Sequence, residues 1–211
     1  MRERLRVFAV WLVAAGISGP VGILLHELGH FAVAAVSGFP DAKLSFASVS
    51  YHDSERFWQT LAGGERLAAE AIYPLQRAGL LAAAGPAVTA LLIVSSVLIL
   101  STRKATDAVA AFLAGLALMA GVRSFTGVYY VLLVRPKYPD ARPFFDEINI
   151  ARAFDIPVDW IAWSSSALVV VAWIVVVPRL TPDRWLKIPA VVVGPILGII
   201  LWAQIGPFIL P

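Results

Sequence analysis

Two histidines and a glutamate stand together in residues 22–35, GILLHELGHFAVAA, where nearly all the other side chains are apolar or small. His26 and His30 are four residues apart, so on an α-helix both imidazoles lie on one face, about one turn from each other. Imidazole is a strong ligand for zinc and similar divalent ions. We therefore expect a helix over this stretch whose two histidines bind one metal ion.

Glu27 follows His26 directly, so its carboxylate lies beside the two imidazoles and not in line with them. A carboxylate in that position can take a proton from a zinc-bound water, which is acidic enough to attack a carbonyl near neutral pH. The pattern is H-E-x-x-H, the signature of zinc metalloproteases. In the alternative interpretation the three side chains only bond to one another or line a polar cavity. Because ionisable groups in apolar helices are costly and rarely kept without a function, we favour the catalytic one.

The elements that must position these residues are long apolar runs. The chain of 211 residues is 59% hydrophobic, with mean hydropathy +0.79, and we expect an all-α polytopic membrane protein with a single domain over residues 1–211. The first run, residues 7–37, would be about 46 Å long as a helix, which exceeds the bilayer core of about 30 Å. Gly19-Pro20 offers a break, so the run is either one kinked helix or two segments, giving five or six spans. The runs cover 7–37, 76–101, 107–134, 160–178 and 188–210.

The net charge of +3 does not predict a nucleic-acid partner, because the basic residues are scattered through loops between the apolar runs. With five spans, alternate loops carry eight basic residues each, and no orientation follows. With six segments the count is eleven against five, which favours cytoplasmic termini and a site near the cytoplasmic face. Arg123, left out of this count, lies within a run, where we expect a buried ion pair.

Two polar stretches interrupt the apolar runs. After Gly38 and Pro40, KLSFASVSYHD is rich in β-branched and aromatic residues, which predicts a short strand or hairpin. Such a strand can bind an extended peptide along its edge. GERLAAEAI predicts a brief amphipathic helix, and FDEINIARAF one or two helical turns among prolines. The chain has no cysteine, so histidine and carboxylate are the strong metal ligands available.

Three segments together resemble the site-2 protease family of intramembrane zinc metalloproteases. HELGHFAVAAVSG is similar to the first active-site helix of that family, KLSFASVSY to the strand that follows it, and AAAGPAVTALL to its Gly-Pro-x-x-Asn helix. Gly85 and Pro86 match the last motif, whereas Thr89 stands where the family has asparagine. The resemblance implies that Thr89, Gly85 and Pro86 bind or orient the substrate. It covers the first 100 residues well and the remainder loosely.

The resemblance also implies a third zinc ligand, usually an aspartate in an Asp-Gly pair, and no such pair occurs in this chain. FFDEINIARAFDIP resembles the third motif of a compact branch without accessory domains. On that resemblance Asp146 is the candidate ligand, with Glu147 next. Asp140 and Asp155 compete in the same segment.

The expected function is therefore that of a zinc-dependent metalloendopeptidase with Zn²⁺ on His26, His30 and Asp146 and with Glu27 as the base. Its partners are the lipid bilayer and a membrane-protein substrate whose transmembrane segment is locally unwound. We expect a multi-pass protein of a prokaryotic cell membrane. The alternatives left open are a zinc hydrolase with another substrate, an ion or proton carrier, and a non-proteolytic, chaperone-like metal-binding protein.

Overall fold

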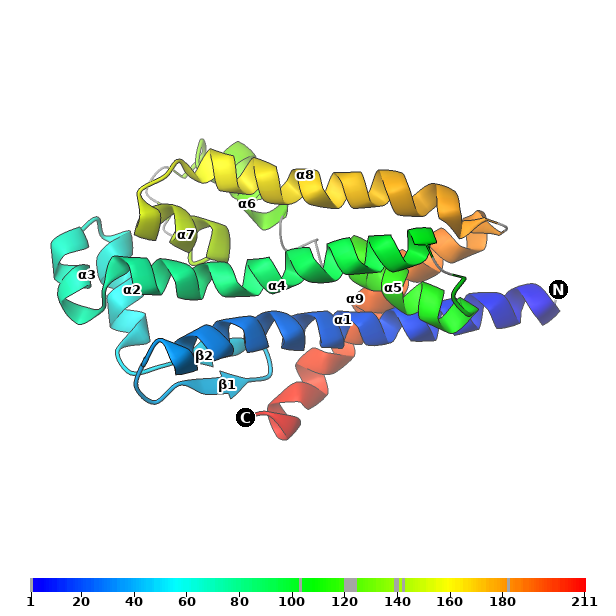
Figure 1. The fold of residues 1–211 in the computed structure, drawn as a ribbon, viewed down its shortest axis with the longest axis horizontal. Coiled ribbons are helices and arrows are strands. Elements are labelled where there is room, and N and C mark those ends of the chain that lie inside the picture. The colour runs from blue at the N-terminus through cyan, green and yellow to red at the C-terminus, as the bar shows by residue number, and fades with distance from the viewer. Residues whose placement is uncertain (1, 103, 120–124, 139–140, 142, 182) are drawn as a thin grey trace.

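The computed structural model describes residues 2–102, 104–119, 125–138, 141, 143–181 and 183–211. Arg123 and Asp140, for which the sequence suggested an ion pair and an alternative ligand, lie outside the described residues. The chain forms a bundle of roughly aligned helices with a small lobe at one end (Figure 1). The elements in chain order are α1 (Arg2–Val36), β1 (Lys43–Ser45), β2 (Ser48–Ser50), α2 (Ser54–Ala62), α3 (Arg66–Ile72), α4 (Leu75–Thr102), α5 (Asp107–Met119), α6 (Phe125–Tyr129), the π-helical turn η2 (Tyr130–Val134), α7 (Asp146–Phe154), α8 (Val158–Val176), the 3₁₀ turn η3 (Val177–Leu180) and α9 (Arg184–Ile209).

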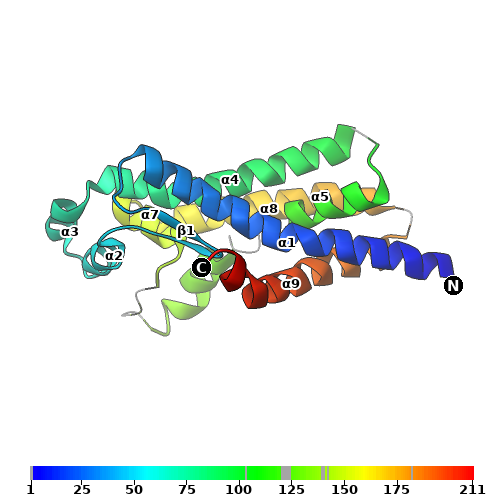
Figure 2. The same ribbon diagram turned by 90° about the horizontal axis from the view of Figure 1, so that it is seen from below.

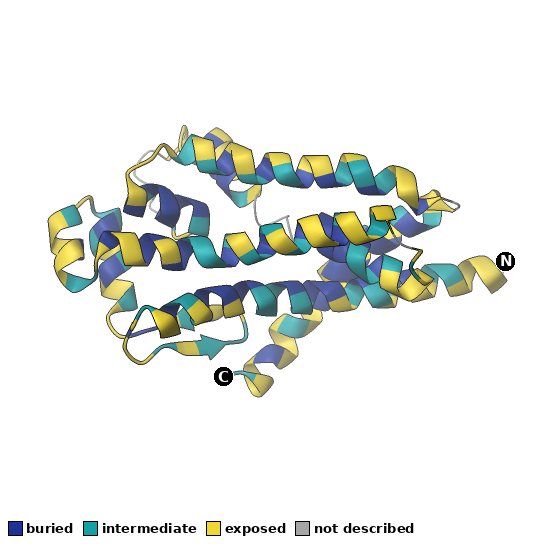
Figure 3. Cartoon of the chain, in the orientation of Figure 1, coloured by how far each residue is buried: buried dark blue, intermediate teal, exposed yellow. Residues whose placement is uncertain are grey.

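Four helical segments among the described residues are long and apolar enough to cross a bilayer: α1, α4, α8 with η3, and α9. Two shorter apolar helices, Asp107–Leu118 and Phe125–Val134, occupy the remaining predicted run. The outward faces of the long helices expose large apolar side chains such as Leu98, Ile174 and Leu201 (Figure 3). Lipid tails can cover such faces, whereas water cannot do so without cost. The structure thus agrees with an all-α membrane-embedded protein.

The first run is one helix, and the interpretation as two segments is wrong. α1 continues through Gly19 and Pro20 from Arg2 to Val36. A Cβ at Gly19 would lie 2.6 Å from the carbonyl oxygen of Pro195, so this glycine allows α9 to approach α1 closely instead of ending the helix. Because this run is a single helix, the charge count that assumed six segments no longer applies. The basic residues then give no orientation.

A β-hairpin follows α1, as the sequence predicted. β1 and β2 pair antiparallel, with Leu44 opposite Val49. The turn between the strands lies against the end of α9 in both views of the bundle (Figures 1 and 2). There Trp202 donates its indole N–H to the carbonyl of Phe46 at 2.8 Å, and the N–H of Phe46 donates to the carbonyl of Leu210 at 3.1 Å. The last helix therefore fixes the hairpin beside α1.

The short helix α7 lies against α4 and the small lobe formed by α2 and α3 (Figure 1). The guanidinium of Arg66, on α3, donates to the last carbonyls of α7, those of Arg152 and Ala153. Charged side chains commonly bond the free carbonyls at a helix C-terminus in this way. At Gly79 of α4 a Cβ would contact the Phe154 ring, so a glycine is needed for this packing. These contacts fix the position of Asp146, the first residue of α7.

Candidate metal centre

His26 and His30 lie on the inner face of α1, and both are buried, with 3% and 6% of their surface exposed. Their Nε2 atoms are 3.1 Å apart, so the two imidazoles point their free edges at the same place. The spacing of four residues therefore places both imidazoles on one face of the helix, as the sequence predicted. It brings two potential ligand atoms together one turn apart on a single helix.

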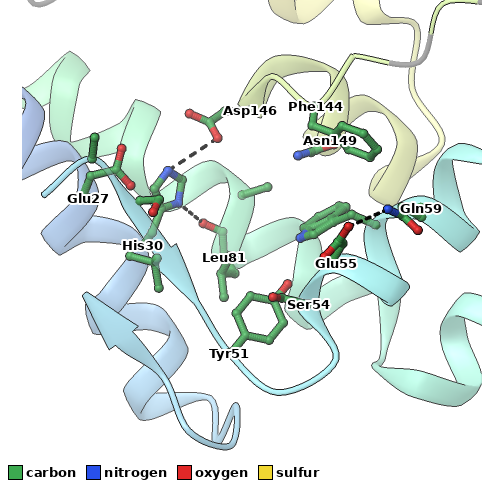
Figure 4. Close-up of a pocket in the computed structure, with 15 residues that line it drawn as sticks. Glu27, His30, Tyr51, Ser54, Glu55, Gln59, Leu81, Phe144, Asp146 and Asn149 are labelled. Carbon is green, nitrogen blue, oxygen red and sulfur yellow. Dashed lines mark hydrogen bonds and ion pairs between the residues drawn. The ribbon is translucent and has the colours of Figure 1, made fainter. Parts of the chain in front are cut away.

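Asp146 comes to the same place from α7, at a distance of 120 residues along the chain from His26. Its Oδ2 lies 2.9 Å from Nε2 of His26. Its Oδ1 lies 3.5 Å from Nε2 of His30, a contact that is drawn as a dashed line in Figure 4. The potential ligand atoms of His26, His30 and Asp146 all lie within 4.8 Å of one another. Among the described residues, these are the histidines and carboxylates that gather closely enough to bind a metal ion.

The separations among the three residues are close to those of a tetrahedral metal site. Zinc bonds to nitrogen and oxygen are about 2.0–2.2 Å long, so neighbouring ligand atoms of a tetrahedral site are separated by about 3.3 Å. Nε2 of His26 lies 2.9 Å from Oδ2 of Asp146 and 3.1 Å from Nε2 of His30, and both separations are near that value. Nε2 of His30 lies 3.5 Å from the other oxygen of the carboxylate, Oδ1, so the two imidazoles face different oxygens of Asp146. Two imidazoles and one carboxylate also leave a fourth position for water, as in catalytic zinc sites. The residues present therefore fit the metal that the sequence predicted; metal binding itself stays a prediction.

α4 orients both imidazoles through their second nitrogen atoms. Nδ1 of His30 donates to the carbonyl of Leu81 at 2.7 Å, which leaves the lone pair of its Nε2 for a ligand. Nδ1 of His26 shares a hydrogen bond of 2.9 Å with Oγ1 of Thr89. Outer partners of this kind fix the orientation and tautomer of metal-binding histidines. Thr89 thus contacts a candidate ligand, while its predicted contact with substrate stays a prediction.

Gly85 lies against the Nε2 edges of the two imidazoles. A Cβ at this position would clash with Nε2 of both His26 and His30, so only glycine leaves room for them. The next residue, Pro86, lines a second cavity of about 200 Å³ together with Thr89 and Glu147. The Gly-Pro pair therefore borders the centre from α4, and its predicted role toward substrate remains a prediction.

Glu27 is buried beside the centre, with 3% of its surface exposed. It lines a cavity of about 440 Å³ together with His30 and Asp146, and we call this the main cavity because it borders the candidate centre. In the close-up its carboxylate lies next to the imidazole of His30 and away from the dashed contacts that join the imidazole to Asp146 and Leu81 (Figure 4). Glu27 thus lies beside His30, and it does not belong to the group of three candidate ligands.

The two other candidate carboxylates of this segment that the structure describes, Glu147 and Asp155, do not belong to the group of close ligand atoms. Glu147 is buried and lines the second cavity, and Asp155 ends α7 with a positive φ of 57°. For Asp146, burial acts to raise the pKa, but when the two imidazoles carry both of their protons, the Nε2–H groups and positive charges of His26 and His30 hold the pKa below its ordinary value. The carboxylate therefore stays ionised, which is the form that binds cations.

The main cavity opens between α1, the hairpin and the small lobe. One wall consists of Ala47, Ser48 and Val49, and the buried hydroxyl of Tyr51 lies behind them. Burial raises the pKa of Tyr51, so its hydroxyl keeps its proton at physiological pH. The opposite wall is formed by Phe144, Asp146 and Asn149.

Sequence reasoning did not find Leu81 or Asn149. Leu81 contributes a backbone carbonyl, which no residue type reveals. Asn149 has a visible signal, because it follows Asp146 by three residues and so lies on the same face of a helix.

Comparison of this chain with protein-family models, with curated proteins and with solved structures finds no match. The resemblance to the site-2 protease family stays a prediction, and a function must be argued from the geometry of the site.

Proposed function

We propose that this protein is a zinc-dependent intramembrane metalloprotease that hydrolyses peptide bonds in or near transmembrane segments of membrane proteins. The observation that carries the proposal is the meeting of His26, His30 and Asp146, from two helices far apart in sequence. The buried Glu27 lines the same cavity as His30 and Asp146. The main cavity gives this group access to a ligand. The surrounding long apolar helices favour a substrate that is itself a membrane protein.

His26, His30 and Asp146 would bind the zinc ion, which when bound supplies a Lewis acid that acidifies a water and polarises a carbonyl. Glu27 is the proton carrier. Its carboxylate oxygen accepts the proton of the attacking water and passes it to the nitrogen of the leaving amine. Thr89 and the Leu81 carbonyl keep the two imidazoles in place while this happens.

The substrate must be extended at the cleaved bond, because a helix buries its carbonyl carbons and uses its backbone groups internally. β2 is bonded to β1, and the described part of the chain places no strand on its other edge. Ser48 and Val49 of this strand line the main cavity with His30 and Glu27. We infer that an unwound segment pairs with β2 and thereby presents a carbonyl to the centre.

A cleavage assay with zinc-loaded protein in detergent micelles and synthetic transmembrane peptides tests the proposal. Glu27→Gln keeps the size of the side chain but cannot accept the proton, so turnover should fall by about 10²-fold or more. Its zinc content should equal that of the wild type. Glu70→Gln, which changes an exposed glutamate on α3, is the matched control and should cleave normally. An active Glu27→Gln protein would eliminate the proposed mechanism.

A further inference from the structure

A buried carbonyl in the main cavity, that of the Asn149 side chain, has no hydrogen-bond partner among the described residues. Asn149 is 8% exposed, and its Oδ1 is buried without a partner. Buried polar atoms in proteins are nearly always paired, because an unpaired one loses its bonds to water without replacement. An exception inside a cavity that borders a candidate catalytic centre indicates that a ligand supplies the missing donor.

The position of Asn149 restricts what that ligand is. Asn149 lies one turn after Asp146 on α7, so its side chain is on the same face as the candidate ligand. Both side chains project into the cavity from α7, while Tyr51 lies on the wall across from them (Figure 4). A molecule that reaches the centre between α7 and the hairpin therefore passes Asn149.

An extended peptide in this cavity needs partners on both of its edges. Its N–H and C=O groups point alternately to one side and the other, and pairing with β2 satisfies one side only. The groups on the second side face α7, where the side chain of Asn149 is buried and an unpaired backbone group beside it is costly. A carboxamide has one hydrogen-bond acceptor and two donors, so it can pair with backbone groups on this second edge of the peptide.

We propose that Asn149 is a substrate-binding residue whose Oδ1 accepts a hydrogen bond from a main-chain N–H of the extended substrate, within a few residues of the cleaved bond. This inference rests on the proposed protease function. Asn149, on the wall opposite the hairpin, then recognises the backbone of the peptide whatever its side chains are. β2 and Asn149 then fix the peptide from both edges while the centre acts on a carbonyl between them.

The first test is stability. Asn149→Leu replaces the carboxamide by an apolar group of similar shape, which removes a buried polar atom without a partner. The thermal unfolding temperature of the zinc-loaded protein without substrate should rise or stay unchanged. A clear fall would show that the carboxamide is a structural group of the resting protein, which overturns the proposal. Gln204→Leu, which changes an exposed amide on α9, is the control.

The second test is binding without cleavage, in the zinc-loaded Glu27→Gln background. Asn149→Leu should weaken the binding of a fluorescent transmembrane peptide, one that the wild type cleaves, by about tenfold. A series of peptides in which single backbone N–H groups are replaced by ester oxygens should contain one member that binds the Asn149 protein more weakly by a similar factor. That replacement should cause no further loss in Asn149→Leu, because the same hydrogen bond is already absent.

Two outcomes overturn the inference alone: equal binding by both proteins, or ester and Asn149→Leu losses that simply multiply. In both cases wild-type cleavage still supports the protease function. A wild-type protein that binds zinc yet cleaves no transmembrane peptide removes the protease function and this inference with it.

Discussion

The two halves of α1 both contain glycines that pack against a neighbouring helix, but these glycines have different roles. In the first half, Gly16 and Gly19 lie against the backbone of α9 around Gly194 and Pro195, and the buried side chains nearby are those of Trp11 and Ala15. In the second half, a Cβ at Gly29 would lie 2.8 Å from the carbonyl of Ala84 on α4. Both halves therefore pack backbone closely against backbone, as helices in membranes commonly do.

The halves differ in what the close approach encloses. The first half encloses an apolar cluster that includes Ala111, Ala114 and Val191, while the second encloses His26, Glu27 and His30. On the α4 side the space for the two imidazoles comes from Gly85, which has no side chain of its own. A small residue thus brings helices together in one half and leaves room for a metal site in the other. Substitutions in the first half should consequently lower the stability of the bundle, and substitutions in the second half should lower its affinity for zinc.

Asp146→Ala should have the largest effect on the site half. Loss of an outer partner of a ligand costs about 10- to 100-fold in metal affinity, so loss of a direct ligand should cost more, and cleavage should disappear with the metal. Zinc titration against a competing chelator measures the change. Asp159→Ala, which removes a surface carboxylate paired with Arg135, is the control. An Asp146→Ala protein with full zinc affinity would move the third ligand to Glu147.

Gly85→Ala should also remove the metal while leaving the bundle folded. The added Cβ meets both Nε2 atoms, so the imidazoles must turn away from Asp146, and overpacking of this kind costs about 1–3 kcal/mol. Zinc content should fall below that of the wild type under the same loading conditions. The helix content, measured by circular dichroism, should be unchanged. Normal zinc content in this variant would contradict the idea that Gly85 makes room for the ligands.

Thr89→Val should weaken the site without destroying it. The methyl group keeps the shape of the side chain but cannot bond Nδ1 of His26, so zinc affinity should fall by about 10- to 100-fold. The control on the same helix is Thr102→Val, whose exposed hydroxyl bonds the carbonyl of Leu98. If Thr89 acts only on substrate, the variant would instead show normal zinc affinity and a raised KM.

Gly198→Ala tests the other half and should affect the site least. Its Cβ would clash with the carbonyl oxygen of Gly16, so α1 and α9 must separate, at a cost of about 1–3 kcal/mol of stability. Unfolding in a denaturing detergent should occur earlier than in the wild type. The zinc affinity of the folded fraction should be normal. A selective loss of zinc would mean that the two halves of α1 are not independent.

The sequence was most informative where the site is local. His26, Glu27 and His30 lie within five residues of one another, and helical periodicity alone places the imidazoles together. The hairpin and the apolar runs were likewise visible as patterns of residue types. Asp146 was reached only through a resemblance, because nothing in FFDEINIARAF tells which carboxylate meets a helix 120 residues earlier.

The break expected at Gly19-Pro20 shows the limit of local rules. Glycine and proline usually end helices in water, but here the neighbouring helix α9 covers Gly19, and α1 continues. The roles of Leu81 and Gly85 were also invisible, since a carbonyl and an absent side chain have meaning only once α4 lies beside α1. Contacts between distant helices decide these points, and residue types do not report them.

Metal content is the most direct test of the central claim, that His26, His30 and Asp146 bind one ion. Wild-type protein and a double His26→Ala, His30→Ala variant, purified side by side after growth with added zinc, are analysed by elemental mass spectrometry. We predict one zinc per chain in the wild type and none in a double variant whose helix content is preserved. Equal zinc contents in the two proteins would contradict it.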